Sequence, residues 1–478
     1  MKKNKHSNRS RRTFIRNSSM AAAGFFIVPR HVLGRGHVAP SDKLNIAGIG
    51  IGGKGESDLA EFSKSPKANV VALCDVDDRQ GKKSRERFSK APYYKDFREM
   101  LEKEKNNIDA VSVSTPDNTH AVAALAAMQL GKHVYCQKPL THDIYEARIL
   151  TEAAKKYKVV TQMGNQGGSG DGVRRSKELI DAGLIGEVTK VECWTNRPVW
   201  PQGVPTPTGQ FEVPKELNWD LWIGPAKMID YNPAYLPFNW RGWWAFGTGS
   251  LGDMACHIMD PVFRCLPIDY PSDVEASVAT IWKEMWNDKS NPDSCPPSSI
   301  IHLTYPRKDK KGQIKVSWYD GGLLPQRPDE LLPEEAFGNW DGGVLFIGTK
   351  GKLLADCYGA NPRLLPTTKM KEKLPAPKLA RVPEGHYVQW VNACIDGYGK
   401  GVTSSPFEFA GPFTESILIG NLAIRSFLMP NPKGKGWNDK YLGRKRLLWD
   451  AKNMKITNFD EANQFVKRDY REGWTLSL

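Results

Sequence analysis

A run of glycines near the amino terminus, GIGIGGKG at residues 48–55, has the spacing of a nucleotide-binding turn. It follows a short apolar segment, KLNIAGIG, which predicts a buried strand. Glycine is needed where a chain turns tightly from a strand into a helix and approaches a pyrophosphate without a Cβ atom. The favoured reading, Gly50-x-Gly52-x-x-Gly55, encloses Gly53, and the register that starts two residues earlier also fits. The turn predicts dinucleotide binding, with the first N–H groups of the next helix facing the phosphates.

An acidic residue stands at the distance that such a site requires. Asp75 ends a second apolar run, VVALCD, 20 residues after Gly55. A carboxylate there can accept hydrogen bonds from both ribose hydroxyls and repels a 2′-phosphate, so it favours NAD over NADP. Arg79 lies close enough to weaken that preference, by pairing with a phosphate or by stacking on adenine, so NADP stays possible. The alternative is a glycine turn beside an exposed acid.

The elements that position these residues alternate between apolar runs and helical patterns as far as about residue 160. Such alternation predicts βαβ units and a parallel Rossmann sheet. Beyond it the apolar runs are spaced more widely and are joined by short turns, which predicts hairpins and an antiparallel sheet in a second, α+β domain. We expect four segments, namely a signal and linker at 1–40, a dinucleotide-binding domain at 41–164, a substrate and oligomerisation domain at 165–432 and a closing tail at 433–478.

The first 40 residues differ from the rest in charge. They hold nine of the 67 Lys and Arg residues and no acid, which leaves 58 basic against 53 acidic residues in the remainder. That balance, without a basic run interleaved with aromatics, excludes a nucleic-acid partner. The segment SRRTFIR, residues 10–16, resembles a twin-arginine signal, and the apolar run after it, about nine residues long, is too short to span a bilayer. We therefore expect export to the periplasm by the twin-arginine machinery and no stable membrane span.

The chain contains eight cysteines and no C-x-x-C pair. An even number in an exported protein can indicate disulfides. The twin-arginine route, however, transports proteins that have already folded in the reducing cytoplasm. We therefore expect the cysteines to be small buried hydrophobic residues.

Two further segments point to a family. They are STPDNTHAV at 114–122 and GKHVYCQKPLT at 131–141. With the glycine turn, they resemble the glucose-fructose oxidoreductase, inositol dehydrogenase and rhizopine-catabolism family (Gfo/Idh/MocA), and specifically its exported members with twin-arginine signals. The resemblance implies a Rossmann domain followed by an α+β domain with an open, mostly antiparallel sheet. It also implies a homo-oligomer, a dimer or tetramer, that pairs through the outer face of that sheet.

The resemblance assigns cofactor and catalytic residues in these segments. Four residues of the first segment would lie along the cofactor: Thr115, Pro116, Asn118 and His120. In the second, Lys138 would lie near the nicotinamide and the substrate, next to Pro139 in a cis peptide. Gln137 stands where the family usually has a cofactor-contacting glutamate, and the resemblance assigns it to the cofactor site.

The segment GTGSLGDMACHIMDPV resembles the family's D-x-x-x-H motif, with Asp253 and His257. On a helix, residues four apart lie on one face. A histidine is suited to general acid/base catalysis near neutral pH, and a neighbouring carboxylate can orient its ring. A core histidine is the alternative. A metal half-site with Asp253 or Asp260 is also conceivable, but there is no third ligand pattern, so we expect no metal.

Seven of the 15 tryptophans lie between residues 194 and 244. Aromatic faces pack against the apolar faces of sugar rings. We therefore expect one or two of the tryptophans near Arg241 to form a carbohydrate-binding surface, and we assign Trp243 and Arg241 to the substrate site. For most of the tryptophans, core packing or a subunit interface is the simpler interpretation.

Together these residues predict hydride transfer between a sugar, glycoside or cyclitol and a tightly bound nicotinamide cofactor. His257 would act as the acid/base, Lys138 would polarise the oxygen or relay the proton, and Asp253 would orient His257. One alternative is an NAD-dependent glycosidase that oxidises its substrate transiently and then eliminates the leaving group. The other is a non-catalytic sugar-binding protein, against which the intact Lys138, Asp253 and His257 argue.

Overall fold

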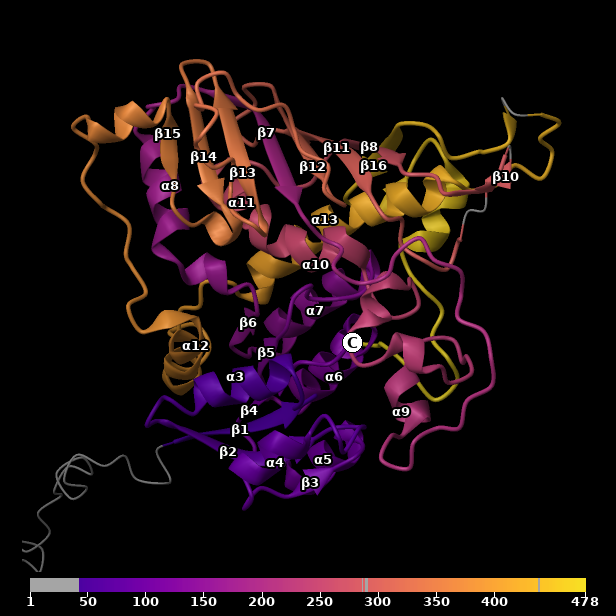
Figure 1. The fold of residues 1–478 in the computed structure, drawn as a ribbon. Coiled ribbons are helices and arrows are strands. Elements are labelled where there is room, and N and C mark those ends of the chain that lie inside the picture. Colours follow the sequence, from indigo (N-terminus) through magenta and orange to yellow (C-terminus); the bar gives the residue numbers. More distant parts are fainter. Residues whose placement is uncertain (1–42, 286, 289–290, 437–438) are drawn as a thin grey trace, which may run out of the picture. The chain divides into compact units, whose positions relative to one another are not determined.

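A computed structural model describes residues 43–285, 287–288, 291–436 and 439–478 of the chain (Figure 1). Residues 44–478 form one compact unit. The predicted twin-arginine signal lies outside the described residues.

The amino-terminal part of this unit contains a six-stranded sheet with the order β3-β2-β1-β4-β5-β6, and all neighbouring strands are parallel. Its strands are β1 (Leu44–Ile49), β2 (Ala68–Cys74), β3 (Tyr93–Tyr94), β4 (Ala110–Val113), β5 (His133–Cys136) and β6 (Thr161–Met163). The intervening helices are α3 (Lys54–Phe62), α4 (Lys82–Arg87), α5 (Phe97–Glu104), α6 (Asp117–Gln129) and α7 (Ile144–Tyr157). The apolar runs become buried strands because helices cover the sheet. The predicted Rossmann sheet is confirmed.

The second sheet, among the described residues, has nine strands in the order β15-β14-β13-β7-β12-β11-β8-β16-β17. Its strands are β7 (Val188–Thr195), β8 (Asp273–Val278), β11 (Ser299–Pro306), β12 (Gln313–Tyr319), β13 (Gly342–Gly348), β14 (Lys352–Asp356), β15 (Arg363–Leu365), β16 (Leu447–Asp450) and β17 (Lys455–Ile456). Every neighbouring pair is antiparallel except β7 with β12. The sheet is not closed, which confirms the predicted fold class. A small hairpin, β9 (Trp282–Glu284) and β10 (Asn287–Asp288), is separate from it.

A long buried helix, α13 (Phe407–Phe427), connects the two sheets, because it packs against α7 of the first part and against β8 of the second (Figure 1). The other helices here are α8 (Asp171–Asp181), α9 (Trp219–Ile223), α10 (Gly249–Ile258), α11 (Asp260–Cys265) and α12 (Gly385–Asp396). Since α10 also contacts α13, its residues are held beside the parallel sheet. In the described chain no helix has the length and hydrophobicity that a bilayer span requires.

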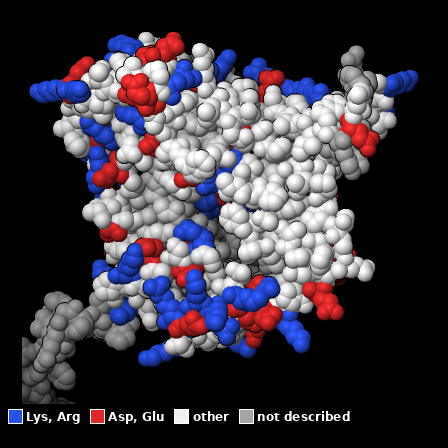
Figure 2. Space-filling model, viewed as in Figure 1, with Lys and Arg blue, Asp and Glu red and all other residues white. Residues whose placement is uncertain are grey.

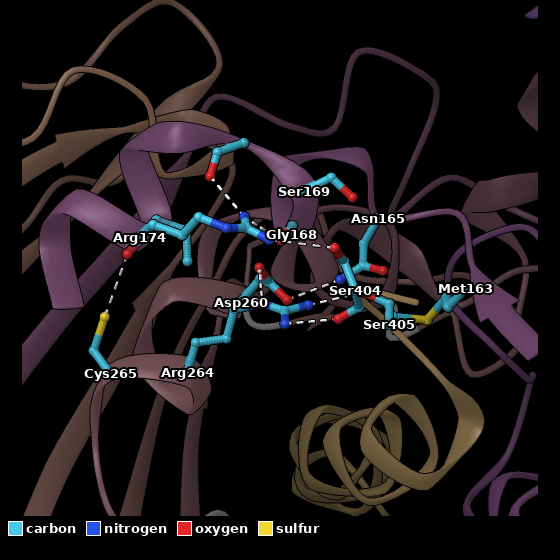
Figure 3. A network of polar contacts seen from close by, with 12 residues as sticks. Met163, Asn165, Gly168, Ser169, Arg174, Asp260, Arg264, Cys265, Ser404 and Ser405 are labelled. Carbon is cyan, nitrogen blue, oxygen red and sulfur yellow. Dashed lines mark hydrogen bonds and ion pairs between the residues drawn. The ribbon is translucent and has the colours of Figure 1, made fainter. Parts of the chain in front are cut away.

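A buried polar cluster joins the end of β6, α11 and the segment before α13 (Figure 3). Asp260 accepts hydrogen bonds from Arg264 Nε at 2.7 Å and from Asn165 Nδ2 at 2.8 Å. Arg264 in turn donates to Ser404 O and Ser405 Oγ, at 2.7 and 2.8 Å. The carboxylate of Asp260 is therefore a structural link, and no group of three or more metal-ligating residues occurs in the described chain.

All eight cysteines lie among the described residues, and all are buried and free of disulfides, as expected.

Candidate active site

One cavity of about 720 Å³ lies at the carboxyl ends of the parallel strands. Residues that end or follow β1, β2, β4 and β5 form one wall, and α10, α9 and the loop around residues 197–241 form the other. Figure 2 shows this face hollowed near its centre, with Lys and Arg atoms in the hollow. Ligands of open α/β sheets bind at this edge, so the cavity is the candidate site.

The glycine turn adopts the geometry of the favoured register. Gly50 directly follows β1 with a φ of +73°, and a Cβ atom there would lie 2.8 Å from the carbonyl group of Ser114. A Cβ atom on Gly55, inside α3, would lie 1.8 Å from the carbonyl oxygen of Gly50. Gly52 and Gly53 line the cavity with Gly50, and no described atom lies within 4 Å of a Cβ position on Gly53. The turn thus leaves open space at the start of α3, whereas Gly55 serves helix packing.

Asp75 lines the cavity beside this turn. Its Oδ2 accepts hydrogen bonds from the backbone N–H groups of Ile51 and Gly52, at 2.9 and 3.2 Å. Burial raises its pKa to about 6, although backbone donors such as Asp77 N–H oppose the shift. Arg79, in contrast, does not line the cavity; it forms a two-point ion pair with Asp77 at 2.8 and 2.7 Å. The predicted contact of Arg79 with the cofactor therefore has no support in this conformation, because Asp77 holds the guanidinium.

The four residues assigned along the cofactor divide into two pairs. Thr115 and Pro116 line the cavity, whereas Asn118 and His120 do not. Asn118 Nδ2 donates to Ile223 O at 2.8 Å, and the His120 ring lies between Thr115 O and Pro139 O at 2.9 and 2.8 Å. Asn118 and His120 therefore hold the loops that form the cavity.

Gln137 lines the cavity and is tied to a buried carboxylate on α3. Its Nε2 donates to Asp58 Oδ2 at 2.8 Å. Asp58 also accepts from Ser114 Oγ at 2.9 Å, from Tyr387 Oη at 3.0 Å and from Lys54 Nζ. The carboxylate next to residue 137 is thus that of Asp58, which lies on α3, and residue 137 itself supplies an amide.

Lys138 enters the cavity directly after β5, and its peptide with Pro139 is cis, as expected. Its Nζ donates to Asp253 Oδ1 at 2.7 Å and to Asp253 O at 2.9 Å. Arg241 Nε reaches the same Oδ1 at 3.3 Å. Burial alone would raise the pKa of Asp253, but the charges of Lys138 and Arg241 outweigh it and hold the pKa at about 2. Asp253 therefore remains an anion that fixes two cations.

His257 lies one helical turn after Asp253 on α10 and lines the same cavity. Burial, followed by the charge of Lys138, lowers its pKa well below 6.5, so the imidazole is neutral near pH 7. Asp253 makes no hydrogen bond or ion pair with His257 in the described chain; its carboxylate faces Lys138. The structure therefore gives no support to the predicted orientation of His257 by Asp253, because the two nearby cations bind the carboxylate.

Tyr358 is a cavity residue that sequence reasoning did not single out. It follows β14, with φ of +65°, and its ring lies 4.6 Å from that of His257, centroid to centroid. Burial raises its pKa to about 12. Its distance in sequence from the other site residues left no pattern to detect. Arg197 also lines the cavity and pairs with Asp341 at 2.9 Å.

The tryptophan-rich segment contributes aromatic residues to the cavity lining, but Trp243, the predicted substrate residue, is not one of them. Trp200 and Trp240 line the cavity with Phe238, and the Arg241 guanidinium lies 4.2 Å from the ring centroids of both Trp240 and Phe238. Trp243 does not line the cavity but packs in a buried aromatic cluster, edge-on to Tyr235. The predicted role of Trp243 as a substrate residue therefore has no support in this conformation.

The sequence matches two models of one protein family. Residues 44–165 match "Oxidoreductase family, NAD-binding Rossmann fold", and residues 170–304 match "Oxidoreductase family, C-terminal alpha/beta domain". The two matches together span more than half of the chain. The protein therefore belongs to the Gfo/Idh/MocA oxidoreductase family.

Among curated relatives, a myo-inositol 2-dehydrogenase of Thermotoga maritima is 27% identical over 188 residues, 39% of this chain and 54% of that protein. An inositol 2-dehydrogenase of Azotobacter vinelandii is 32% identical over 153 residues, 31% of this chain and 45% of that protein. The matches thus span about half the length of these relatives.

Solved structures with the same fold include the WlbA dehydrogenase of Bordetella pertussis in complex with NADH and UDP-GlcNAcA. Its TM-score is 0.53 at 17% identity, covering 79% of this chain and 95% of that one. A levoglucosan dehydrogenase in complex with NADH and L-sorbose has a TM-score of 0.53 at 16% identity, covering 80% and 98%.

The residues present fit a nicotinamide dinucleotide. The turn from Gly50 to Gly53 leaves open space at the start of α3, where backbone N–H groups can receive a pyrophosphate. Asp75 stands at the position of a ribose-binding carboxylate. The amino-terminal domain is an NAD-binding Rossmann domain.

Proposed function

We propose that the protein is an NAD-dependent oxidoreductase that transfers hydride between a sugar, glycoside or cyclitol and a tightly bound nicotinamide cofactor. The main support is that one cavity contains both the dinucleotide turn and the group formed by Lys138, Asp253 and His257. The curated relatives named as inositol dehydrogenases support a polyol substrate. The Asp75 carboxylate favours NAD over NADP.

Lys138, His257 and Asp253 have separate roles in the proposed reaction. The bound nicotinamide accepts or returns the hydride. The Lys138 ammonium, held by Asp253 at 2.7 Å, polarises the substrate oxygen and stabilises negative charge that develops on it. His257 is neutral near pH 7 because of its burial, so it can accept the hydroxyl proton during oxidation and return it during reduction. Asp253 positions Lys138 and, through the same oxygen, Arg241.

A second activity, NAD-dependent glycoside cleavage, is favoured by the contact between Tyr358 and His257. Elimination of a glycosidic bond next to a transient ketone requires an acceptor for a C–H proton and a donor for the leaving oxygen. The proton that His257 takes up during oxidation can pass to the leaving oxygen, so the C–H proton requires a second base. Tyr358, beside His257, is the candidate for that base, and it acts only as the phenolate, because burial raises its pKa to about 12.

We further propose export by the twin-arginine route and action in the periplasm as a dimer or tetramer. The support is the SRRTFIR segment and the short apolar run after it. Nicotinamide dinucleotides are not supplied outside the cytoplasm, so the protein must fold around its cofactor before export and regenerate it in place.

The test is to purify the mature protein from the periplasm, denature it and quantify the nicotinamide released per chain. A yield near one supports tight binding, and less than a few per cent contradicts it. Chromogenic glycosides then separate the two activities: release of the leaving group without added cofactor indicates cleavage, and a keto-sugar product indicates dehydrogenation. Unchanged turnover in His257→Ala would contradict the acid/base role of His257, and the absence of either product from the wild type would leave only a sugar-binding role.

A further inference from the structure

The carboxy-terminal segment, residues 466–478, returns from the second sheet to the Rossmann domain. It contains no helix or strand. Its first anchor is Arg468, whose Nη2 donates to Glu146 Oε1 and to Asn118 O, both at 2.6 Å. Glu146 lies in the first turn of α7, and Asn118 lies in the first turn of α6. This partly buried arginine therefore fixes the segment against two helices of the dinucleotide-binding domain.

The second anchor, Arg471, joins the segment to the loop that contains α9. Its Nη1 pairs with Asp220 Oδ1 at 2.5 Å, and its Nε donates to Gly224 O at 3.1 Å. Its backbone N–H group donates to Pro225 O at 3.1 Å. The α9 loop itself pairs with the end of β2, where Asp77 forms a β-bridge with Leu217. Arg471 thus joins the carboxy-terminal segment to the α9 loop, at the edge of the parallel sheet where β2 ends.

Between these anchors and the end of the chain, Trp474 lines the large cavity. Its ring lies 6.1 Å from that of Phe97, and the Arg98 guanidinium lies 4.5 Å from its centroid. Phe97 follows β3, and Asp75 follows β2. In the sheet order these strands lie on the opposite side of β1 from β5, which precedes Lys138. Trp474 therefore stands at the adenosine end of the cavity, away from the catalytic group.

We propose that Trp474 is a cofactor-binding residue that forms a wall of the adenosine site, and that Arg468 and Arg471 hold this segment as a strap that slows release of the dinucleotide. This inference rests on the proposed function. An indole offers a flat apolar face to a purine ring. Because the strap has no backbone ladder of its own, the side-chain anchors determine whether Trp474 stays in place.

The test measures the dissociation rate of NADH by stopped-flow displacement with excess NAD, followed by the emission of NADH itself. Loss of one stacked aromatic corresponds to about 10- to 100-fold, so Trp474→Ala should release NADH faster by about that factor. Trp474→Phe should restore most of the retention, and Arg471→Met should accelerate release by a smaller factor. The matched control is Trp340→Ala, since Trp340 is 81% exposed and does not line the cavity.

Three results would decide whether the carboxy-terminal segment acts as a strap. Release at the wild-type rate from both Trp474→Ala and Arg471→Met, with unchanged thermal unfolding, overturns the strap. If Trp474→Ala does not fold, the comparison of Trp474→Phe and Arg471→Met with the Trp340→Ala control decides in its place. If the wild-type protein itself binds no NADH, the proposed function fails instead, and that outcome is distinct from loss of the strap alone.

Discussion

The two ends of the cavity are built in different ways. At the dinucleotide end, the glycine turn and Asp75 come from one stretch of 26 residues, from Gly50 to Asp75, and act mainly through backbone geometry. The catalytic end brings Lys138, Asp253 and Tyr358 together from distant segments and is held by ion pairs. The first end is specified locally, whereas the second exists only because α13 and α10 fix the second domain against the first.

The largest expected effect is at the catalytic end. Lys138→Met removes the cation nearest the reacting oxygen, and kcat should fall by about 10²- to 10³-fold. Because Lys138 lies away from Asp75, NADH affinity should change by only a few-fold. Steady-state kinetics and NADH titration measure the two effects separately. A comparable loss of NADH affinity would contradict the division into two ends.

The next effect concerns the backbone of the dinucleotide end. Gly50→Ala combines a φ of +73° with an overlap at 2.8 Å, and we expect a loss of about 2–4 kcal/mol in unfolding free energy. Gly183→Ala is the matched control, since its φ is +72° and no described atom lies within 4 Å of its Cβ position. It should cost only about 1–2 kcal/mol. Urea unfolding compares them, and equal losses would show that the overlap is unimportant.

The junction between the two ends is tested at Gln137. Gln137→Glu places a second carboxylate 2.8 Å from that of Asp58. One of the two must then keep a proton, so the variant should lose about 1–3 kcal/mol relative to wild type at pH 8 and less at pH 5.

The exchange variant Asp58→Asn/Gln137→Glu should recover part of this loss, because it restores one amide and one carboxylate. Unfolding at both pH values gives the comparison, and a loss that does not depend on pH would count against a charge effect.

A smaller effect is expected in the pH profile. Because the pKa of His257 lies well below 6.5, kcat/KM should stay level as the pH falls through 6.5 and decline only in more acidic solution. The Asp253 carboxylate favours the protonated ring, so Asp253→Asn should lower the pKa of His257 further. Titration of the ring by NMR checks the direction, and an acidic limb at pH 6.5 in the wild type would refute the assignment.

The smallest effect is expected at Arg79. Since Asp77 binds its guanidinium outside the cavity, Arg79→Ala should leave the ratio of NAD to NADP affinity within about threefold. Asp75→Ser, which removes the carboxylate that lines the cavity beside the glycine turn, should shift that ratio toward NADP. Competitive titration of both cofactors measures it, and a large shift in Arg79→Ala would restore the contact expected from the sequence.

The comparison of the two ends also explains what the sequence could predict. The glycine register, Asp75 and the alternating elements follow from neighbouring residues. The structure confirms the alternating elements and places the glycine turn and Asp75 in the lining of one cavity. The direction of a side chain does not follow in this way. Trp243 and Trp240 lie within one short turn, yet only Trp240 reaches the cavity.

Partners distant in sequence were the least predictable. Tyr358 and Trp474 reach the cavity from elements whose positions depend on packing of the whole unit. The carboxylate behind Gln137 comes from Asp58, 79 residues earlier, and no local pattern links the two. The contact of the Asp253 carboxylate with Lys138 was not predicted, because helical spacing does not reveal a lysine that approaches from another domain.

The complete burial of the eight thiols has a consequence for maturation. A chain whose sulfur atoms are all enclosed needs no oxidative catalyst to reach its final covalent state. Buried thiols also react slowly with peroxide and in mixed-disulfide exchange, so the covalent structure of the chain should be the same in a reducing and in an oxidising solution.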